Sequence, residues 1–287
     1  MRFVDLLARA ERRNDSLLCV GLDPEAGSLP SHWRNDPARI FDFCAAIVDA
    51  TRDLVIAYKP QIAHFASQRA EAQLERLIEH IHDAAPEIAV ILDAKRGDIG
   101  STATHYAREA FDRYGADAVT LSPFLGFDSI EPYLQYPEKG TILLCRTSNP
   151  GGSDLQAQRL ETGDLLYEHI AKLASGEWNR TGQMSLVVGA TFPGEIARVR
   201  ELAPTLPLLI PGLGAQGGDA AAAVTAGWRG TRAEHAVATT GPVIVNSSRA
   251  VLYASADRDF AEAARQVALT TRAELNRGRV LDSRPVP

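Results

Sequence analysis

Eight short apolar runs, each followed by a window with helical periodicity, repeat along the chain without an intervening linker. Each run has the length of a strand that is buried on both faces. The runs occupy residues 17–22, 54–59, 88–95, 118–122, 141–147, 185–190, 206–211 and 242–247. Strands that alternate with helices form parallel sheets. Eight such units in about 260 residues fit a closed (β/α)8 barrel, the TIM barrel, better than an open doubly wound sheet.

The two ends of the chain extend this pattern. We expect a leading helix over 3–13 and a last helix over 259–276, and both windows carry an apolar stripe. The length of 287 residues would allow two domains, but a barrel of about 250 residues is one domain. We therefore predict a single domain over 1–287, with a frayed tail at 280–287.

Composition excludes several classes of protein. The formal net charge is −6, so the chain offers no basic stripe for nucleic acid. It contains no apolar stretch of about 18 residues for a membrane span, and its first sixteen residues alternate charge with Leu and Ala, unlike a signal peptide. Cys19, Cys44 and Cys145 lie in apolar segments, which favours core positions and a reducing compartment. We predict a cytoplasmic protein.

Polar side chains gather where the predicted strands end, which is where active sites lie in (β/α)8 barrels. Those that follow the first, second, third and fifth runs are Asp23, Lys59, Asp93, Lys95, Asp98 and Ser148. Side chains two residues apart on a strand point the same way, so Asp93 and Lys95 should share a face above a buried core. In a purely structural alternative, these two residues only form an ion pair, and Asp98 or Ser101 caps a helix that begins near Gly100.

A glycine-rich segment, PGLGAQGGD at 211–219, follows the seventh run. It satisfies the dinucleotide pattern G-x-G-x-x-G, but that fingerprint belongs after the first strand of a βαβ unit, so we do not expect a nucleotide cofactor. Barrels often hold a phosphate group at this place. Arg249, just past the eighth run, can supply a bidentate contact to phosphate; a surface ion pair is the alternative.

Taken together, the motifs VGLDP, AYKP, LDAKRGDIGST, TSNP, PGLGAQGGD and NSSR resemble the orotidine 5′-phosphate decarboxylase family, in particular its longer bacterial subgroup. The resemblance spans nearly the whole chain. It implies decarboxylation of orotidine 5′-phosphate to uridine 5′-phosphate (UMP) in de novo pyrimidine biosynthesis, without a cofactor or a metal. It also implies a homodimer with shared active sites. The chain has Ser248-Arg249 where the short-chain subgroup has Gly-Arg.

The resemblance also implies a role for each matching residue. Lys59, Asp93, Lys95 and Asp98 look like the alternating charged network of the family, with Lys95 as the proton donor. The residues expected to contact substrate are Asp23, Ile99, Thr102, Ser148, Gly214, Gln216 and Arg249. Among these, Asp98, Ile99 and Thr102 would enter the site of the neighbouring subunit. Asp23 and Lys59 look like ribose contacts, Ser148 like a pyrimidine contact, and Gln216 and Arg249 like phosphate ligands.

The reaction explains why such residue types are needed. Loss of CO2 from C6 leaves an electron pair in an sp2 orbital orthogonal to the ring π system, so the ring cannot delocalise it. An ammonium fixed beside C6, here that of Lys95, can stabilise the carbanion and then protonate it. Asp93 would repel the substrate carboxylate until CO2 departs. Phosphate contacts can drive loop closure, and the insertion at 149–163 is either a lid or a disordered excursion.

Two other functions remain open. The first is a magnesium-dependent sugar-phosphate decarboxylase or hexulose-phosphate synthase on the same barrel, which resembles D-x-K-x-x-D as well. Those enzymes place a metal-binding Glu where this chain has Lys59, whose ammonium would repel Mg2+. The second is a non-catalytic phosphate-binding protein, which would need Arg249 and the glycine loop but not a lysine between two carboxylates.

Overall fold

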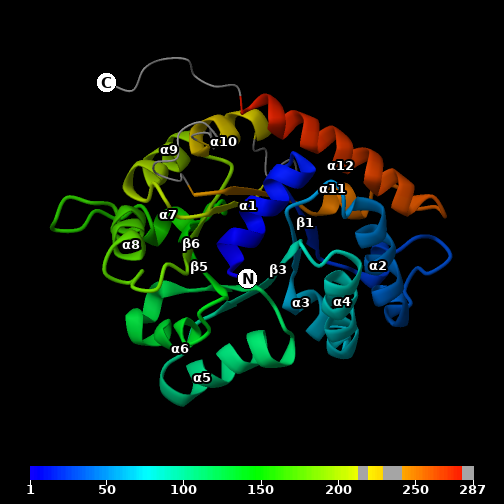
Figure 1. Cartoon of the computed structure of the whole chain (residues 1–287), viewed down its shortest axis with the longest axis horizontal. Coiled ribbons are helices and arrows are strands. Elements are labelled where there is room, and N and C mark those ends of the chain that lie inside the picture. Colours follow the sequence, from blue (N-terminus) through cyan, green and yellow to red (C-terminus); the bar gives the residue numbers. More distant parts are fainter. Residues whose placement is uncertain (213–218, 229–240, 280–287) are drawn as a thin grey trace.

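The computed structural model describes residues 1–212, 219–228 and 241–279, and its strands form a closed parallel barrel in chain order (Figure 1). β1 pairs with both β2 and β8, which closes the sheet. The strands are β1 (Leu18–Leu22), β2 (Ala57–Pro60), β3 (Ala89–Arg96), β4 (Ala118–Leu121), β5 (Gly140–Arg146), β6 (Met184–Val188), β7 (Leu208–Ile210) and β8 (Val243–Ser247). All eight predicted strands are present, which confirms the (β/α)8 barrel.

Helices surround the barrel, so that each strand is followed by helical structure before the next one begins (Figure 1). Those between β1 and β5 are α2 (Ile40–Thr51), α3 (Ile62–Ala66), α4 (Glu71–Ala84), α5 (Gly100–Arg108) and α6 (Glu131–Leu134). The later ones are α7 (Gly152–Leu155), α8 (Leu166–Ser175), α9 (Pro193–Leu202), α10 (Ala220–Gly227), α11 (Arg249–Leu252) and α12 (Phe260–Arg277). The predicted leading helix is α1 (Phe3–Asn14), and the predicted last helix is α12.

The core lies between the strands and this ring of helices. All five residues of β1 are buried, as expected for a strand covered on both faces. The helix α4 buries one stripe, at Leu74, Leu77, Ile78 and Ile81. The three cysteines are buried and unpaired, which confirms that they are core residues. Burial raises the pKa of the Cys19 thiol to about 12, so this thiol stays neutral near neutral pH.

The helix α1 covers the end of the barrel where the strands begin, in front of the centre of the view in Figure 1. The amide of Phe3 donates to the Glu138 carbonyl, just before β5. Gly140 opens β5 directly beneath the Phe3 ring, where a Cβ atom would lie 2.3 Å from a ring carbon. Arg9 and Arg13 both pair with Glu87, just before β3. A side chain at position 140 would therefore displace α1.

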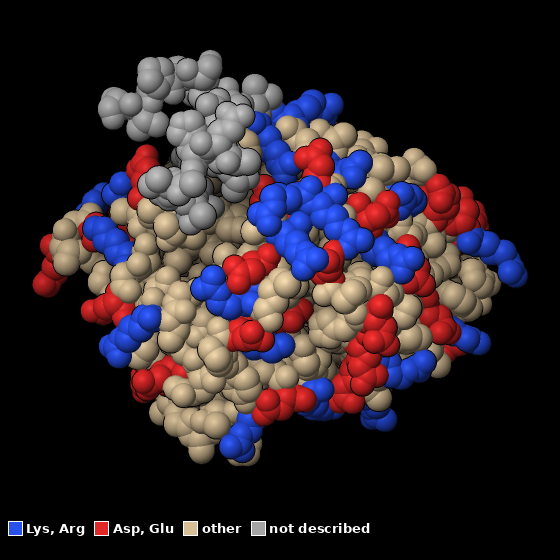
Figure 2. Space-filling view, in the orientation of Figure 1, with Lys and Arg blue, Asp and Glu red and all other residues tan. Residues whose placement is uncertain are grey.

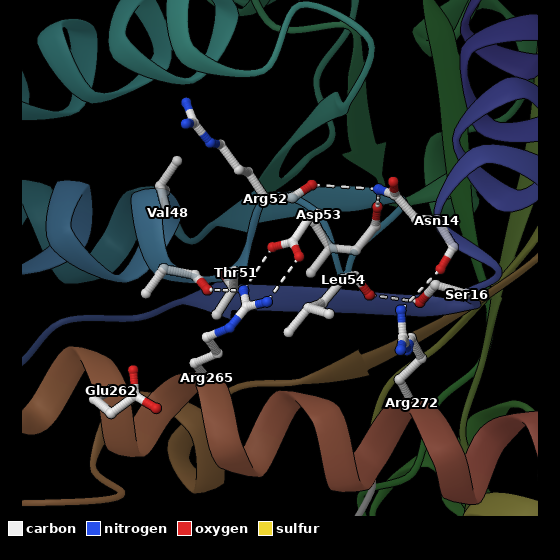
Figure 3. Close-up of polar contacts among 12 residues, drawn as sticks. Asn14, Ser16, Val48, Thr51, Arg52, Asp53, Leu54, Glu262, Arg265 and Arg272 are labelled. Atoms are coloured by element: carbon white, nitrogen blue, oxygen red, sulfur yellow. Dashed lines mark hydrogen bonds and ion pairs between the residues drawn. The ribbon is translucent and has the colours of Figure 1, made fainter.

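The last helix binds the same end of the barrel (Figure 3). The Arg265 guanidinium on α12 donates to both carboxylate oxygens of Asp53, at 2.6 and 2.8 Å, in the turn between α2 and β2. Two turns further along α12, Arg272 donates to the Asn14 carbonyl at 3.1 Å. These contacts connect the C-terminal helix to α1 and to the turn before β2, which completes the ring at the point where β8 meets β1.

The face in Figure 2, which is the face of Figure 1, carries acidic and basic side chains next to one another. None of the described helices is long and apolar enough to cross a membrane. The tail predicted at 280–287 lies outside the described residues.

Candidate active site

A cavity of about 260 Å3 opens at the carboxyl ends of β1, β2, β3 and β8. Its described lining consists of Asp23, Lys59, Gln61, His64, Asp93, Lys95, Pro211, Gly212, Asn246, Ser248, Arg249 and Ala250. Five of the site residues predicted from the sequence are among them. Residues 213–218, which adjoin Gly212 in the chain, lie outside the described residues.

Asp93 is the centre of the charged cluster in this cavity. Its Oδ2 accepts from Lys59 Nζ at 2.9 Å and its Oδ1 accepts from Lys95 Nζ at 2.7 Å. Asp93 and Lys59 are only 7% and 4% exposed. Burial acts to raise the pKa of Asp93, but the two ammonium groups outweigh it and hold that pKa well below its usual range. Asp93 is therefore an anion throughout the neutral pH range.

The lysine at the bottom of this cluster is also held in its charged form. Burial acts to lower the pKa of Lys59, but attraction to the carboxylates of Asp93 and Asp23 raises it above its ordinary value. The distance from Lys59 Nζ to Asp23 Oδ1 is 3.9 Å. The Lys95 side chain is 47% exposed, so its ammonium is the cation of the cluster that incoming molecules can reach.

The serine that departs from the short-chain pattern contributes to the cluster. Ser248 Oγ donates to Asp23 Oδ2 at 2.6 Å, which leaves Asp23 Oδ1 buried without a hydrogen-bond partner. Gly21 on β1 makes room for this contact, because a Cβ atom there would lie 2.7 Å from the Ser248 Cβ. A buried carboxylate oxygen that accepts no hydrogen bond is costly, and the Lys59 ammonium at 3.9 Å is too far away to donate one. Asp23 is thus prepared to accept a hydrogen bond from a ligand hydroxyl.

Arg249, the first residue of α11, lies at the rim of the cavity, and its guanidinium makes no ion pair with the described carboxylates. Gly212, which follows the neighbouring strand β7, also lines the cavity and has a φ of 102°, a left-handed conformation that suits glycine. Asp219 then caps α10 by accepting from the Ala222 amide at 3.0 Å. Gly214 and Gln216, the other predicted phosphate contacts, lie outside the described residues.

Three predicted site residues do not line the cavity of their own chain. Asp98 is half-buried, its Oδ1 accepts from the Ile99 amide at 2.8 Å, and Ile99 and Thr102 are exposed. The helix α5 does begin at Gly100, as expected, but no side chain caps it. The cap by Asp98 or Ser101 that the structural alternative expected is therefore wrong, whereas its ion pair between Asp93 and Lys95 is present.

Ser148 follows β5 and is likewise absent from the described lining of this cavity. Arg146, the last residue of β5, lies two residues before Ser148. Its guanidinium donates to Glu195 Oε2 at 2.8 Å and to Ser153 Oγ at 3.0 Å. Arg146 is only 3% exposed. Because Glu195 belongs to α9 and Ser153 to α7, Arg146 connects the insertion at 149–163 to the end of β5 and to α9.

Sequence reasoning missed three polar residues of the lining. Gln61 and His64 follow Lys59 at the end of β2, and Asn246 lies on β8 two residues before Ser248. The Oδ1 atom of Asn246 is buried without a hydrogen-bond partner. Its position was readable from the sequence, because residues two apart on a strand share a face. No comparable sequence signal identified His64.

No group of three or more His, Cys, Asp or Glu side chains within residues 1–212, 219–228 and 241–279 is arranged to hold a metal ion. The cationic cavity wall is instead formed by Lys59, Lys95 and Arg249. Three cations against the two carboxylates of Asp23 and Asp93 suit an anionic small molecule. The chemistry of the cavity is that of a fixed ammonium presented beside a buried carboxylate.

Comparisons with known proteins agree with this geometry. Residues 16–267 match the profile of the "Orotidine 5′-phosphate decarboxylase / HUMPS family". The orotidine 5′-phosphate decarboxylase of Methylibium petroleiphilum is 70% identical over 282 residues, which cover 97% of this chain and 100% of that protein. The solved OMP decarboxylase of Leishmania donovani has a TM-score of 0.78 and 38% identity, covering 96% of this chain and 99% of that one. The UMP synthase of L. donovani has a TM-score of 0.81 and 39% identity, but the chain spans only 57% of its length.

Proposed function

Because the chain belongs to the orotidine 5′-phosphate decarboxylase family, we propose that its Lys95 is the group that protonates C6 of the substrate. The protein is a carboxy-lyase of pyrimidine biosynthesis that converts orotidine 5′-phosphate to UMP. The observation that carries the proposal is the position of Lys95, whose ammonium lies 2.7 Å from the buried Asp93 carboxylate and is half exposed to the cavity.

In the proposed mechanism the C6–carboxylate bond breaks and its electron pair stays on C6. The Lys95 ammonium stabilises this carbanion and then gives it a proton, which yields UMP and CO2. Lys59 holds Asp93 in place through the other carboxylate oxygen, at 2.9 Å. Asp93 in turn fixes the ammonium of Lys95. No cofactor is needed, because the charge that develops is met by a cation already in position.

We also assign residues to the ribose, the phosphate and the pyrimidine of the substrate. We assign the ribose hydroxyls to Asp23 and Lys59, since Asp23 Oδ1 is buried without a hydrogen-bond partner. We assign the phosphate to Arg249 together with Gln216 and Gly214 of the glycine-rich segment, and the pyrimidine to Ser148. Phosphate binding far from C6 supplies energy that can be used to close the site, so Arg249 should affect turnover as well as affinity.

We also propose a homodimer in the cytoplasm, with one barrel domain per chain. Asp98, Ile99 and Thr102 would complete the site of the partner. Ile99 is 55% exposed, and Phe124 and Leu125 in the loop after β4 are 75% and 45% exposed. Ser122, which begins that loop, donates its amide to the Arg96 carbonyl at 2.7 Å, so the two segments lie side by side. A second copy of the chain would cover this apolar surface.

The substitution Lys95→Ala tests the assigned role. It should reduce kcat by at least about 10^4-fold, because general acid catalysis and electrostatic stabilisation each contribute about 10^2-fold or more. UMP should still bind, since the ribose and phosphate contacts are made by other residues. The measurement is the change in ultraviolet absorbance of orotidine 5′-phosphate, with UMP affinity from calorimetry.

The matched control is Lys172→Ala, which removes a lysine that pairs with Asp164 on the outer ring of helices. This control should turn over like the unmodified enzyme. Substantial turnover by the Lys95→Ala protein would remove Lys95 from the mechanism. If Mg2+ restored activity that EDTA had removed, the metal-dependent relative would be the better description.

A further inference from the structure

The strand that carries Asp93 and Lys95 leaves its regular pairing at these residues. Along β3 and β4, Leu92 pairs with Val119, but the next pair is Arg96 with Leu121. Three residues of β3, at 93–95, therefore face one residue of β4, Thr120. The backbone N–H groups within such an irregularity lose their ladder partners and need others when they are buried.

Thr120 supplies the hydrogen-bond acceptor that two of these backbone N–H groups lack in the ladder. Its Oγ1 accepts from the Ala94 amide and from the Lys95 amide, both at 3.0 Å. The same hydroxyl donates to Asp93 Oδ1 at 2.8 Å. A hydroxyl has one proton to donate and two lone pairs, so these three hydrogen bonds saturate it. Thr120 is 1% exposed, so water does not compete for them.

The backbone that this hydroxyl holds is in an uncommon conformation. Lys95 has a φ of 47°, in the left-handed region, which is uncommon for a residue with a Cβ atom. Such a conformation persists only when its surroundings fix it. Here the Lys95 amide is fixed by Thr120, and the Lys95 ammonium is fixed by Asp93, whose Oδ1 Thr120 also contacts. The Thr120 hydroxyl thus contacts both the backbone amide of Lys95 and the carboxylate that binds the Lys95 ammonium.

We infer that Thr120 is a positioning residue for the decarboxylation. It holds the Lys95 backbone in its left-handed conformation and orients the Asp93 carboxylate, so that the ammonium stands at a fixed place in the cavity. Thr120 is absent from the described cavity lining and acts through the other two residues. This inference rests on the proposed roles of Lys95 and Asp93 and adds a residue that they depend on.

Three variants test it. Thr120→Val keeps the shape and removes the hydroxyl, Thr120→Ser keeps the hydroxyl, and Thr141→Val is the matched control. Thr141 on β5 is also fully buried, but its Oγ1 has no hydrogen-bond partner among the described residues. Thr120→Val should lower kcat by about 10^2-fold, as a misplacement near 1 Å does. Its UMP affinity should stay within a few-fold, and Thr120→Ser and Thr141→Val should turn over almost normally.

The split between kcat and UMP affinity separates positioning from general damage. A Thr120→Val enzyme with normal kcat would overturn the inference, as would a Thr120→Ser enzyme that is as slow as the valine variant. Parallel loss of kcat and UMP affinity would mean a structural role and overturn it too. If Thr120→Val does not fold, Thr120→Ala is judged by the same criteria. Activity retained in Lys95→Ala would instead refute the proposed function, so the two failures are distinguishable.

Discussion

Asp93 is the residue on which the charges of the cavity depend. Its two oxygens accept from two ammonium groups and one hydroxyl, and it is almost fully buried. A buried charge is tolerated when it is paired and hydrogen-bonded, whereas removing one partner leaves the others uncompensated. Lys59 would be the most affected, because its side chain is only 5% exposed. The cluster is thus expected to contribute to stability as well as to the proposed catalysis.

The substitution Asp93→Asn should lower the free energy of unfolding by about 3–5 kcal/mol at neutral pH, the range for breaking a buried ion pair. The depressed pKa of Asp93 contributes stability that is present above the unfolded value near pH 4 and is lost as the pH falls through the folded value. The raised pKa of Lys59 contributes stability that is present below the unfolded value near pH 10 and is lost as the pH rises through the folded value.

The stability gap between the unmodified protein and Asp93→Asn should therefore be constant from about pH 5 to pH 9 and narrow below about pH 4. Denaturant titrations at pH 7, 4 and 3, followed by circular dichroism, measure it. A gap of the same size at pH 3 as at pH 7 would show that the Asp93 charge is not its source.

At the scale of elements, the sequence was sufficient for the strands and for most of the helices. Buried parallel strands read as short apolar runs, and each of the eight is found within three residues of its predicted ends. The second strand begins at Ala57 instead of at residue 54, because Leu54 and Val55 are buried below the barrel and lie outside the ladder. Apolar content alone does not distinguish a residue buried within a strand from one buried just before it.

The site was predictable only as far as side chains could be placed at strand ends. Asp93 and Lys95 do lie together, but an irregularity in β3, and not regular alternation, brings them there. Nothing in the sequence around Lys95 favours a positive φ, since lysine has no preference for it. Thr120 was missed for a related reason: a threonine within an apolar strand reads as an ordinary strand residue.

A substitution of Asn14 tests the polar contacts at the end of the barrel where the strands begin (Figure 3). Its Nδ2 donates to the Val55 carbonyl at 2.7 Å and to the Arg52 carbonyl at 3.3 Å, and the residue is 8% exposed. Asn14→Ala should lower the free energy of unfolding by about 1–3 kcal/mol, because a buried carbonyl loses its donor. The value of kcat should not change, since the site lies at the other end of the strands. Urea titration and the ultraviolet assay measure the two effects.

Asp53→Ala is the control for this prediction. It removes the ion pair with Arg265 at the same end of the barrel, in which the Asp53 side chain is 57% exposed. Its cost should be below about 1 kcal/mol, as for other ion pairs at the surface. Equal losses of stability in Asn14→Ala and Asp53→Ala would mean that burial does not decide how much these contacts contribute.

At the scale of the whole molecule, the two ends of the barrel are built differently. The amino end is covered by α1 and tied to α12 through paired side chains and backbone carbonyls. The carboxyl end carries a left-handed lysine, a buried carboxylate oxygen without a donor, and exposed apolar side chains. Such features are unfavourable in an isolated chain and are expected where a ligand or a second chain completes the structure.

The proposed shared site makes a prediction that a single chain cannot satisfy. Each site would use Lys95 of one chain and Asp98 of the other. Mixing inactive Lys95→Ala and Asp98→Ala proteins under conditions that exchange subunits should then restore activity. In a mixed dimer one site carries both lesions and the other carries none. With random pairing of equal amounts, half the dimers are mixed and each has one intact site of two, so the expected limit is about a quarter of the unmodified activity.

Mixing Lys95→Ala with Asp93→Asn is the matched control, because both residues belong to the same side of the proposed site. Asp93 and Lys95 of one chain are in direct contact at 2.7 Å, so in this mixed dimer each of the two sites keeps one lesion. No activity should return, although the subunits exchange equally well. Exchange is verified independently by mass spectrometry of differently labelled chains. If verified exchange left the Lys95→Ala and Asp98→Ala mixture inactive as well, Asp98 would serve its own chain and the dimer would not share its sites.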